Sequence, residues 1–177
     1  MMAGPALTRD LRFRDAVASD GPAMLALHRA AIFAVPDRFY DDAMRRSWAS
    51  GLTGDSYRQS MTGGETFELA SDGSGRVVGF CGVKDGEVCG LYVHPDVQGG
   101  GVGSALLARA EARIADAGNE RSRIVASLNA QSFYESRGWT LSGFETRKSR
   151  GGDMQKVALM EKRLVNGAAG GNVDDVL

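Results

Sequence analysis

Apolar and polar residues follow two different periods in the first third of the chain. Residues 11–15 alternate between apolar and polar side chains, which predicts a short strand. Between 19 and 32 the apolar residues recur at helical spacing, after a Ser-Asp cap and with Pro22 in the first turn. Acidic residues open 41–48, which predicts a second helix, and 56–61 is expected to add another turn or two.

The middle of the chain predicts three strands and then a long helix. The strands are expected at 66–70, 77–83 and 87–93, and Asp85-Gly86 between the last two is a hairpin-turn sequence. The helix is expected over 104–114, because good helix formers dominate this stretch and its apolar residues recur on one side.

The last third of the chain predicts three strands and a short helix. The strands are expected at 124–128, 141–148 and 155–164, with the helix after the first of them. The predicted order is β-α-α-β-β-β-α-β-α-β-β, in which several hairpins and few crossovers indicate an α+β domain with a mixed sheet and helices on both faces. We expect one domain over 1–165. Gly, Ala, Asn and Asp dominate 166–177, which predicts a flexible tail.

Composition limits the classes of function open to this sequence. The 177 residues, 43% of them hydrophobic, suffice for one domain with a substantial core. The formal net charge of -1 predicts no general attraction to nucleic acid or to an anionic membrane. No apolar run approaches the length of a membrane span, and residues 1–11 lack the apolar centre of a signal peptide. We therefore expect a cytoplasmic protein.

Two cysteines, Cys81 and Cys89, lie on either side of the predicted hairpin turn. A two-residue turn pairs Lys84 with Glu87 and Gly82 with Cys89. Because side chains alternate along a strand, Cys81 and Cys89 would then lie on opposite faces and remain free thiols. Two cysteines without a neighbouring histidine also give no indication of a metal site.

A glycine-rich loop connects the strand at 87–93 to the helix at 104–114. Its sequence is Gln98-Gly-Gly-Gly-Val-Gly-Ser104. Glycines let a ligand approach the backbone N–H groups, and the dipole of the following helix adds positive potential at the same place. Acidic residues are absent from 98–110, so the helix start carries no anion of its own. The loop therefore predicts a site for an external anion.

Two common phosphate-binding loops fit this sequence poorly. A P-loop requires lysine and then Ser or Thr after its last glycine, whereas Gly103 is followed directly by Ser104. A dinucleotide-binding fold requires an acidic residue about 20 positions further on, and 122–124 contains none. An ordinary glycine-rich turn remains the alternative at this point.

Two segments of the chain match one known family when they are taken together. The spacing Gln98-x-x-Gly101-x-Gly103 resembles the Q/R-x-x-G-x-G/A loop of the GCN5-related N-acetyltransferases (GNAT). The segment 129–138 resembles a later part of that family, in which a strand ends at Asn and a short helix carries Phe-Tyr and closes at Arg-Gly. The resemblance is close over 87–139. It implies a mostly antiparallel sheet of about six to seven strands, splayed between the fourth and fifth strands where the thioester arm inserts.

The resemblance also implies a co-substrate and the residues that hold it. Acetyl-coenzyme A is the implied co-substrate, with its pyrophosphate at the loop amides, and no metal is implied. Asn129 could instead cap a helix, and Arg137 could be a solvated side chain. The residues implied to contact the coenzyme are Leu91, Tyr92, Val93, Gln98, Gly99, Gly100, Gly101, Val102, Gly103, Ser104, Asn129, Phe133, Tyr134 and Arg137.

Acetyl transfer to an amine needs a proton donor for the leaving thiolate and a proton acceptor for the amine. Tyr134 matches the family's tyrosine, and a phenol of pKa about 10 can donate to a developing thiolate; a core aromatic is the alternative. Glu87 starts the fourth strand, where some members of the family keep a glutamate that deprotonates the amine through water. A solvated glutamate is an equally weighted alternative, and His28 and His94 are further candidates for the base.

The resemblance implies that the first helices and neighbouring strands build the acceptor pocket, and this region is rich in aromatic residues. In this region His28, Ile32, Tyr40, Trp48 and Phe67 are expected to line the pocket, and for at least half of the aromatic wall core packing is the alternative.

The leading functional prediction is an N-acetyltransferase that moves an acetyl group from acetyl-coenzyme A to a primary amine of a small molecule by direct attack in a ternary complex. A protein or peptide N-acetyltransferase is the first alternative. A non-catalytic sensor of acyl-coenzyme A is the second, and it could dispense with Tyr134 and Glu87. We expect no nucleic-acid or membrane partner, and we leave the oligomeric state open, with a homodimer as one arrangement.

Overall fold

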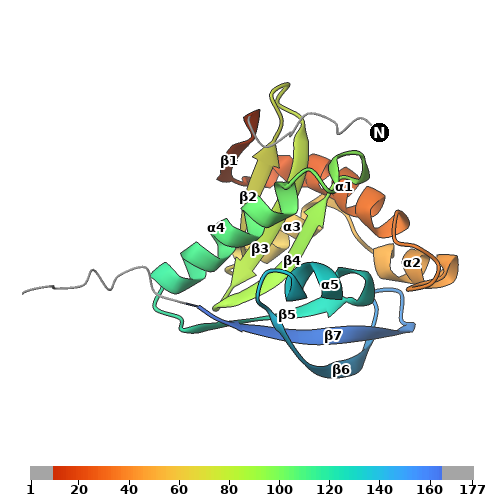
Figure 1. Ribbon diagram of the computed structural model, residues 1–177. Coiled ribbons are helices and arrows are strands. Elements are labelled where there is room, and N and C mark those ends of the chain that lie inside the picture. Colours follow the sequence, from red (N-terminus) through yellow and green to blue (C-terminus); the bar gives the residue numbers. More distant parts are fainter. Residues whose placement is uncertain (1–9, 165–177) are drawn as a thin grey trace, which may run out of the picture.

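A computed structural model describes residues 10–164 of the chain. Their seven strands form one sheet in the order β1-β2-β3-β4-β5-β7-β6 (Figure 1). Neighbouring strands are antiparallel except β4 and β5, which are parallel. This confirms the predicted mixed, mostly antiparallel sheet. The start of the chain and the tail expected over 166–177 lie outside the described residues. The strands are β1 Arg12–Asp15, β2 Thr66–Ser71, β3 Val77–Lys84, β4 Glu87–Val93, β5 Arg121–Ser127, β6 Thr140–Lys148 and β7 Met154–Arg163.

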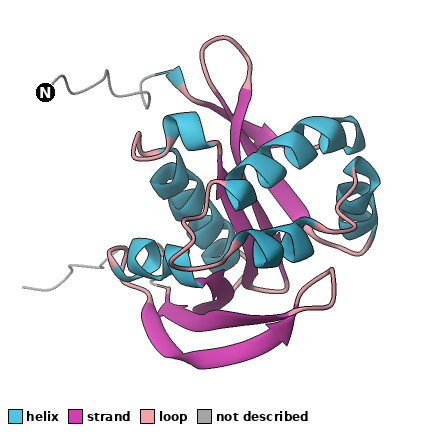
Figure 2. Cartoon of the chain, turned by 90° about the vertical axis from the view of Figure 1, so that its right-hand side faces the viewer, coloured by secondary structure: helices cyan, strands magenta, loops and turns pink. Residues whose placement is uncertain are grey.

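Helices cover both faces of the sheet, as the sequence predicts (Figures 1 and 2). On one face α4 packs on β2, β3 and β4, and α5 packs on β6 and β7. On the other face α1 and α3 pack together against β2 to β4, with α2 beside α1. The helices are α1 Gly21–Phe33, α2 Asp42–Ala49, α3 Gly54–Thr62, α4 Val102–Asp116 and α5 Gln131–Glu135, and short 3-10 turns occur at Ala18–Asp20, Pro95–Val97 and Leu128–Ala130.

The helix α3 is longer than the one or two turns that the sequence predicts, because it spans nine residues. Its start is capped locally, since the Thr53 N–H donates to Ser56 Oγ at 3.1 Å. Its stability depends on distant residues: Tyr57 is 5% exposed and packs edge-on against Phe67 and Phe80 of the sheet. A single buried aromatic gives little periodicity, so the sequence pattern understates this helix.

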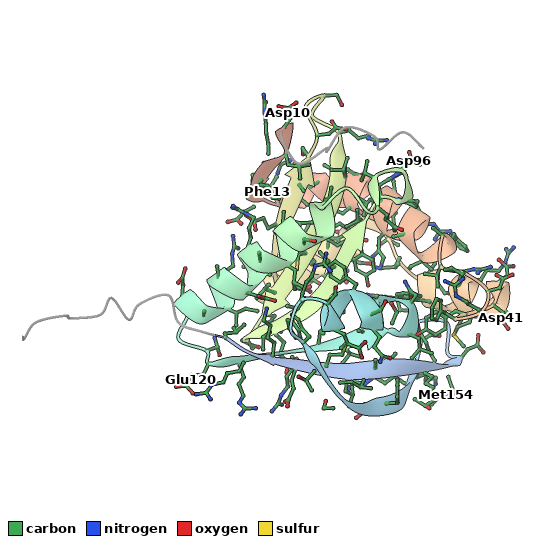
Figure 3. All side chains as sticks on the ribbon, viewed as in Figure 1. Asp10, Phe13, Asp41, Asp96, Glu120 and Met154 are labelled. Atoms are coloured by element: carbon green, nitrogen blue, oxygen red, sulfur yellow. The ribbon has the colours of Figure 1, made fainter. Side chains whose placement is uncertain are left out.

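The larger core layer lies between the sheet and α4. The apolar stripe predicted for this helix is buried, and Leu106 and Leu107 are 0% and 1% exposed. Burial of each such leucine contributes about 1.5–3 kcal/mol to folding. Phe13 on β1 extends the layer (Figure 3), and the Arg109 guanidinium lies 4.7 Å above the centroid of its ring. Packing of this kind fixes the start of α4 against the end of β4.

The hairpin between β3 and β4 departs from the predicted register. Its turn has positive φ at Asp85 (50°) and Gly86 (79°), as a type I′ turn requires, and Lys84 pairs with Glu87. The predicted pairing of Gly82 with Cys89 is wrong, because Gly82 pairs with Gly90 and Cys89 is the extra residue of a β-bulge. The extra residue lets Val88, Leu91 and Val93 all pack toward α4, which strict alternation would forbid. Both cysteines are free; Cys81 is buried and Cys89 is exposed.

A gap opens between β4 and β5. The two strands share one pair of register partners, Glu87 and Arg123, whereas β5 pairs with β7 from Arg121 to Ser127. Beyond Glu87 the strands therefore diverge, as Figure 1 shows. This confirms the splay predicted between the fourth and fifth strands, and it leaves one backbone edge of β4 without a strand partner.

Candidate active site

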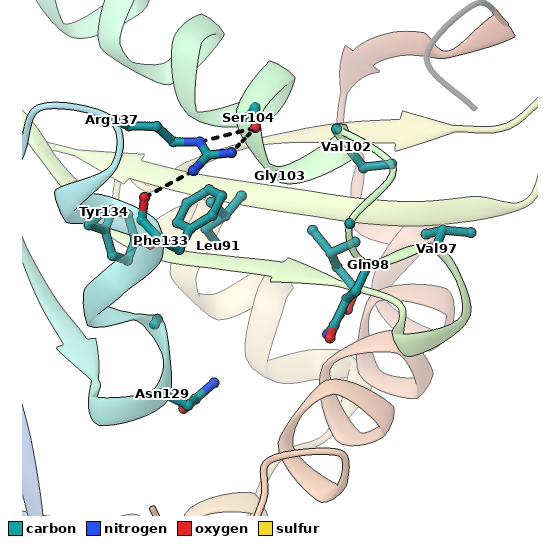
Figure 4. A pocket seen from close by; sticks show the side chains of 14 residues that line it. Leu91, Val97, Gln98, Val102, Gly103, Ser104, Asn129, Phe133, Tyr134 and Arg137 are labelled. Carbon is teal, nitrogen blue, oxygen red and sulfur yellow. Dashed lines mark hydrogen bonds between the residues drawn. The ribbon is translucent and has the colours of Figure 1, made fainter. Parts of the chain in front are cut away.

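A groove of about 350 Å³, which we call the front groove, lies where the end of β4, the start of α4 and α5 meet (Figure 4). All its lining residues come from these elements and from the short connections next to them. They are Leu91, Val93, Val97, Gln98, Gly99, Gly101, Val102, Gly103, Ser104, Asn129, Ala130, Phe133, Tyr134 and Arg137.

The floor of the front groove presents a set of unpaired backbone N–H groups. Those of Gly99, Gly101, Val102, Gly103 and Ser104 meet no acceptor in the described part of the chain, and the first paired amide is that of Ala105. Gly101 caps the helix with φ of 87°, a left-handed conformation that glycine adopts without strain. The first turn of α4 contains no acidic residue, so neither a side chain nor a paired charge offsets the positive end of the helix dipole.

Glycine at position 103 packs closely against the opposite wall of the groove. A Cβ atom there would lie 3.3 Å from the ring of Phe133 and 3.4 Å from Val93 Cγ2. The absence of a side chain lets α5 approach the start of α4 and narrows the groove between them. The glycine loop thus combines accessible amides with a fixed opposite wall.

The free edge of β4 adds polar groups to the same groove. The His94 N–H donates to Val78 O at 2.9 Å, so alternate residues of β4 direct their backbone groups toward β3. The backbone groups of Leu91 and Val93 therefore point into the gap beside β5. Gln98 Nε2 donates to Val93 O at 3.1 Å, and the buried Asn129 Oδ1 has no hydrogen-bond partner among the described residues.

Arg137 places a positive charge beside the start of α4. Its Nε donates to Ser104 Oγ at 3.0 Å and its NH1 donates to Phe133 O at 3.0 Å (Figure 4). Its guanidinium carbon also lies 3.9 Å from the centroid of the Phe133 ring. Three contacts hold the charge in place, so a phosphate oxygen at the helix start would meet a preformed donor.

Tyr134 lies at the inner end of the front groove. It is 3% exposed, and its ring packs edge-on against Phe133 (5.1 Å between centroids) and Trp139 (5.6 Å). Burial raises its pKa well above the usual value, and Cys81 and Tyr92 add to the effect. The phenol therefore stays protonated at neutral pH and is able to donate a hydrogen bond.

A second hollow, the back pocket, lies on the opposite face of β4 and has a volume of about 140 Å³. Tyr92 separates the two spaces, since its side chain points to the back while Leu91 and Val93 face the front groove. The lining residues of the back pocket are His28, Leu52, Ser56, Tyr57, Ser60, Glu65, Phe67, Phe80, Cys89, Gly90, Tyr92 and Arg150.

Aromatic rings form one wall of the back pocket. The ring of His28 lies 3.7 Å from that of Tyr92 and 5.9 Å from that of Phe80, between centroids. His28 Nδ1 lies 2.9 Å from the Tyr57 hydroxyl, whereas its buried Nε2 has no partner among the described residues. Burial lowers the pKa of His28 to about 3, with Arg150 adding to the effect, so the imidazole is neutral.

Two opposite charges face the same pocket. Burial raises the pKa of Glu65, while Ser60, Cys89 and the charges of Lys84 and Arg150 act in the other direction. Burial also raises the pKa of Cys89 to about 12, with Glu65 adding to the effect, so its thiol is protonated. The pocket thus holds a carboxyl group whose pKa is raised by burial.

A sequence model of the acetyltransferase (GNAT) domain matches residues 35–160. The chain belongs to the GNAT acetyltransferase family. A search of curated proteins finds no match to the sequence.

Solved structures of GNAT proteins have the same fold. The GCN5-related N-acetyltransferase from Rhodopseudomonas palustris superposes with a TM-score of 0.81 at 26% identity, over 88% of this chain and 96% of that one. The PaiA N-acetyltransferase from Thermoplasma acidophilum, solved with coenzyme A, gives 0.68 at 18% identity over 86% and 98%. A phosphinothricin acetyltransferase of the GNAT superfamily from Sinorhizobium meliloti, solved with acetyl-coenzyme A, gives 0.68 at 20% over 94% and 95%.

In this GNAT domain most of the residues expected to contact the coenzyme line one groove. The exceptions are Gly100, which lies in the loop without lining the groove, and Tyr92, whose side chain lines the back pocket. Alternation along β4 places the Tyr92 side chain on the face opposite to those of Leu91 and Val93.

The residues expected around the acceptor divide into two groups. His28 and Phe67 line the back pocket. Ile32 and Trp48 pack in a small cluster between α1 and α2, and Tyr40 packs edge-on against Trp48. The Tyr40 hydroxyl donates to Lys156 O at 2.6 Å and accepts from the Leu128 N–H at 2.9 Å. These two bonds tie the α1–α2 connection to β7 and to the 3-10 turn after β5.

The structure separates Glu87 from both spaces. It is exposed at the first position of β4, and it lines a different hollow together with Arg123 and residues of β6 and β7. His94 caps a 3-10 turn, where its Nδ1 accepts from the Asp96 N–H at 3.3 Å. Neither residue lines the back pocket.

Three polar residues of the back pocket escape sequence reasoning: Glu65, Cys89 and Arg150. Glu65 precedes β2 as a single acid in a short connection, and Arg150 occupies a turn 85 positions later by their numbering, so no motif joins them. One of these positions leaves a trace in the sequence. The apolar residues at 88, 91 and 93 break strict alternation, which indicates the bulge that turns Cys89 toward the pocket.

Residues 10–164 include no helix with the length and apolar character that a membrane crossing requires. Within the same residues, no group of three or more His, Cys, Asp or Glu side chains is placed to hold a metal ion.

Proposed function

We propose that this GNAT protein transfers the acetyl group of acetyl-coenzyme A to the primary amine of a small molecule, by direct attack in a ternary complex. The observation that carries the proposal is the position of the front groove and the back pocket on opposite faces of β4, beside the gap to β5. A thioester in the groove and an amine in the pocket would meet through this gap. Direct attack then requires no covalent intermediate on the protein.

The front groove suits coenzyme A in three respects. The unpaired N–H groups of Gly99 and of residues 101–104 would bind the pyrophosphate, and Arg137 would reach a phosphate oxygen. The free edge at Leu91 and Val93 and the unpartnered Asn129 Oδ1 offer hydrogen bonds to the amides of the pantetheine arm. The relatives from T. acidophilum and S. meliloti, solved with coenzyme A and acetyl-coenzyme A, support the same use here.

Acetyl-coenzyme A supplies the acetyl group as a thioester, and the amine nitrogen bonds to the acetyl carbon as the carbon–sulfur bond breaks. Tyr134 would donate its proton to the departing sulfur, and a backbone N–H at 91–93 would donate to the acetyl oxygen. An ammonium group loses two protons in becoming an amide N–H. One of them would restore Tyr134, and the other would leave through the base.

We place the base at Glu65 in preference to Glu87. Glu65 lines the back pocket, and its raised pKa brings it nearer to neutral pH than an exposed carboxylate, which favours proton exchange with the amine. Ser60 and Cys89 act on the pKa of Glu65 in the direction opposite to burial, which favours the carboxylate form that a base needs. Glu87 remains the second candidate, and from its own hollow it would need a chain of water molecules to reach the amine.

The dimensions of the back pocket favour a small acceptor over a peptide. Its volume of about 140 Å³ is well below the 350 Å³ of the front groove, and α1, α3 and the β6–β7 turn all contribute to its wall. A peptide acceptor would need an open channel. A sensor of acyl-coenzyme A would need neither the Tyr134 phenol at the gap nor a carboxyl group behind it.

The proposal is tested by measuring thiol release from acetyl-coenzyme A across a panel of small primary amines and short peptides. We expect release that requires both the protein and a small amine, with the acetylated amine found by mass spectrometry. Tight coenzyme binding without release by any acceptor would establish the sensor alternative. Release with peptides alone would establish the peptide alternative.

The cellular location and the assembly stay as predictions. A cytoplasmic location agrees with acetyl-coenzyme A as co-substrate, and fractionation of the native host checks it. A homodimer is one arrangement of the chain, and light scattering coupled to size-exclusion chromatography measures it directly.

A further inference from the structure

We propose that the acceptor is an amino acid: an amine that also carries a carboxylate, which Arg150 binds at the far wall of the back pocket. This inference rests on the proposed acetyl transfer and specifies its substrate class. The observation behind it is that Glu65 and Arg150 face one pocket from different elements, and neither forms an ion pair within residues 10–164.

Arg150 is held at the pocket by an anchored turn. The turn between β6 and β7 packs on α2, where Ser149 Oγ lies 2.7 Å from Ser47 Oγ and the Gly151 N–H donates to Ser47 O at 2.8 Å. The Asp153 N–H also lies 3.3 Å from Ser47 Oγ. These contacts flank Arg150 on both sides, so its side chain projects from a fixed backbone.

The charge of Arg150 reaches the whole pocket. Burial is the main cause that lowers the pKa of His28, and the charge of Arg150 is the second. The same charge opposes the effect of burial on the pKa of Tyr57, Tyr92 and Glu65. Four side chains from α1, α3, β4 and the residue before β2 therefore lie within range of one guanidinium. Arg150 is itself exposed, and it lines the pocket together with aromatic residues such as Tyr57 and Tyr92. A guanidinium beside such rings is matched best by a carboxylate, which it binds through two parallel hydrogen bonds.

His28 supplies a second, independent indication of a polar ligand. It is 7% exposed and one of its ring nitrogens, Nε2, has no partner among the described residues. A neutral imidazole with one nitrogen paired to Tyr57 leaves a donor or an acceptor unsatisfied, at a cost that a bound polar group would remove. The pocket thus offers Arg150 for the anion, Glu65 for the amine, and His28 between polar and aromatic neighbours.

The volume of the pocket limits the side chain of the amino acid. About 140 Å³ excludes an extended peptide, and the rings of Tyr57, Phe67 and Phe80 favour an apolar body. We therefore expect small or medium apolar amino acids among the acceptors.

The test compares amino acids with their primary amides, which have nearly the same shape and no carboxylate. The probes are L-methionine, L-leucine and L-phenylalanine, each with its amide, in the thiol-release assay. Loss of the negative charge lowers the pKa of the neighbouring ammonium, so simple amine reactivity favours the amide. We expect the opposite order in the wild-type protein, with kcat/KM at least about tenfold higher for the amino acid.

Variants assign the preference to Arg150. Arg150→Gln should lower kcat/KM for the amino acids by about 10- to 100-fold and change that for the amides less than about twofold, which abolishes the preference. Arg150→Lys should keep part of it. Lys148→Gln removes a positive charge next to the same turn but outside the pocket, and it should leave the preference intact. Affinity for coenzyme A should not change in any of them.

Several results would overturn the inference. Equal rates for acids and amides in the wild-type protein would do so, as would an Arg150→Gln variant that loses both classes equally. If no acceptor releases thiol, calorimetry on the coenzyme-loaded protein decides. Binding of the amino acid but not of its amide would keep the pocket assignment and reject the transfer reaction, whereas binding of neither would reject the pocket assignment.

Discussion

Ser47 Oγ lies 2.7 Å from Ser149 Oγ, although the two residues are 102 positions apart in the chain. Ser47 belongs to α2 and Ser149 to the turn between β6 and β7, so this contact closes the back pocket on the side where Arg150 enters. The contact is tight because position 151 is a glycine. A Cβ atom there would lie 2.5 Å from Ser47 Oγ and 2.8 Å from its backbone O.

Gly151→Ala is therefore expected to displace the turn from α2. Overpacking of this kind costs about 1–3 kcal/mol, and the displaced Arg150 should raise KM for the acceptor while the affinity for coenzyme A stays unchanged. Gly143→Ala is the matched control, since a Cβ at that position meets nothing within 4 Å. Denaturant unfolding and steady-state kinetics measure the two effects. Wild-type stability and KM in the Gly151→Ala variant would show that the contact does not position the pocket wall.

The anion site at the start of α4 is tested at Gly101. Its φ of 87° is tolerated by Asn and Asp better than by other side chains, so Gly101→Asn and Gly101→Asp carry similar strain and differ in charge. We expect the Asp variant to bind coenzyme A at least about tenfold more weakly than the Asn variant, because a carboxylate would face the pyrophosphate. Calorimetry gives both dissociation constants. Equal values would place the pyrophosphate elsewhere.

Tyr134→Phe removes one hydroxyl and keeps the packed ring. If the phenol protonates the leaving thiolate, kcat should fall by about 10²- to 10⁴-fold. The affinity for coenzyme A should change little, because the interaction develops mainly in the transition state. Steady-state kinetics with the best amine, together with a coenzyme titration, measure both quantities. Full turnover in this variant would reject the acid role.

Glu65→Gln and Glu87→Gln separate the two candidates for the base. The pKa of Glu65 is raised by burial, and its carboxylate form must be present, so activity should rise with pH through a value above the usual range for glutamate. In the Glu65→Gln variant, the rise of activity with pH should move to still higher pH, since the amine must then enter the pocket already neutral. Glu87→Gln should keep the wild-type profile. The reverse result would return the role to Glu87.

His28 predicts a dependence of stability on pH. Its pKa is lowered by burial, and further by Arg150, to about 3 in the folded protein, against about 6.5 in an unfolded chain. Between these values the unfolded state binds more protons, so the free energy of unfolding falls as pH falls, by up to about 1.4 kcal/mol per pH unit. This contribution is absent above about pH 7. Urea unfolding from pH 6.5 to pH 5 should show a smaller slope in His28→Asn than in the wild-type protein, and identical slopes would contradict the assignment.

Much of the fold and of the front groove can be predicted from the sequence, because local rules govern those parts. The Asp85-Gly86 turn and the left-handed Gly101 are set by backbone sterics at single residues. The apolar stripe of α4 is likewise visible in the sequence, since helical periodicity alone defines its buried face. The strand–loop–helix unit and the anion site at its centre therefore follow from residues that are close together along the chain.

The back pocket depends on contacts that no local rule specifies. In the sequence, Ile32 and Trp48 suit a ligand wall as well as His28 and Phe67 do. The packing of α1 against α2 buries the first two away from the pocket, whereas packing against the sheet places the other two in it. The bulge at Cys89 arises because three apolar residues of β4 are buried on one face, which overrides strict alternation. Glu65 and Arg150 line the same pocket because the β6–β7 turn packs on α2.

Local patterns in the sequence thus predict the order of elements and the glycine loop before α4, and the family resemblance adds the splay of the sheet. The packing of distant elements puts Glu65 and Arg150 along one pocket, whereas Glu87 lines a hollow of its own. This difference follows from the distance along the chain over which each kind of interaction acts. Backbone conformation and periodic burial act over a few residues, whereas the convergence of charges in a pocket depends on how whole elements pack.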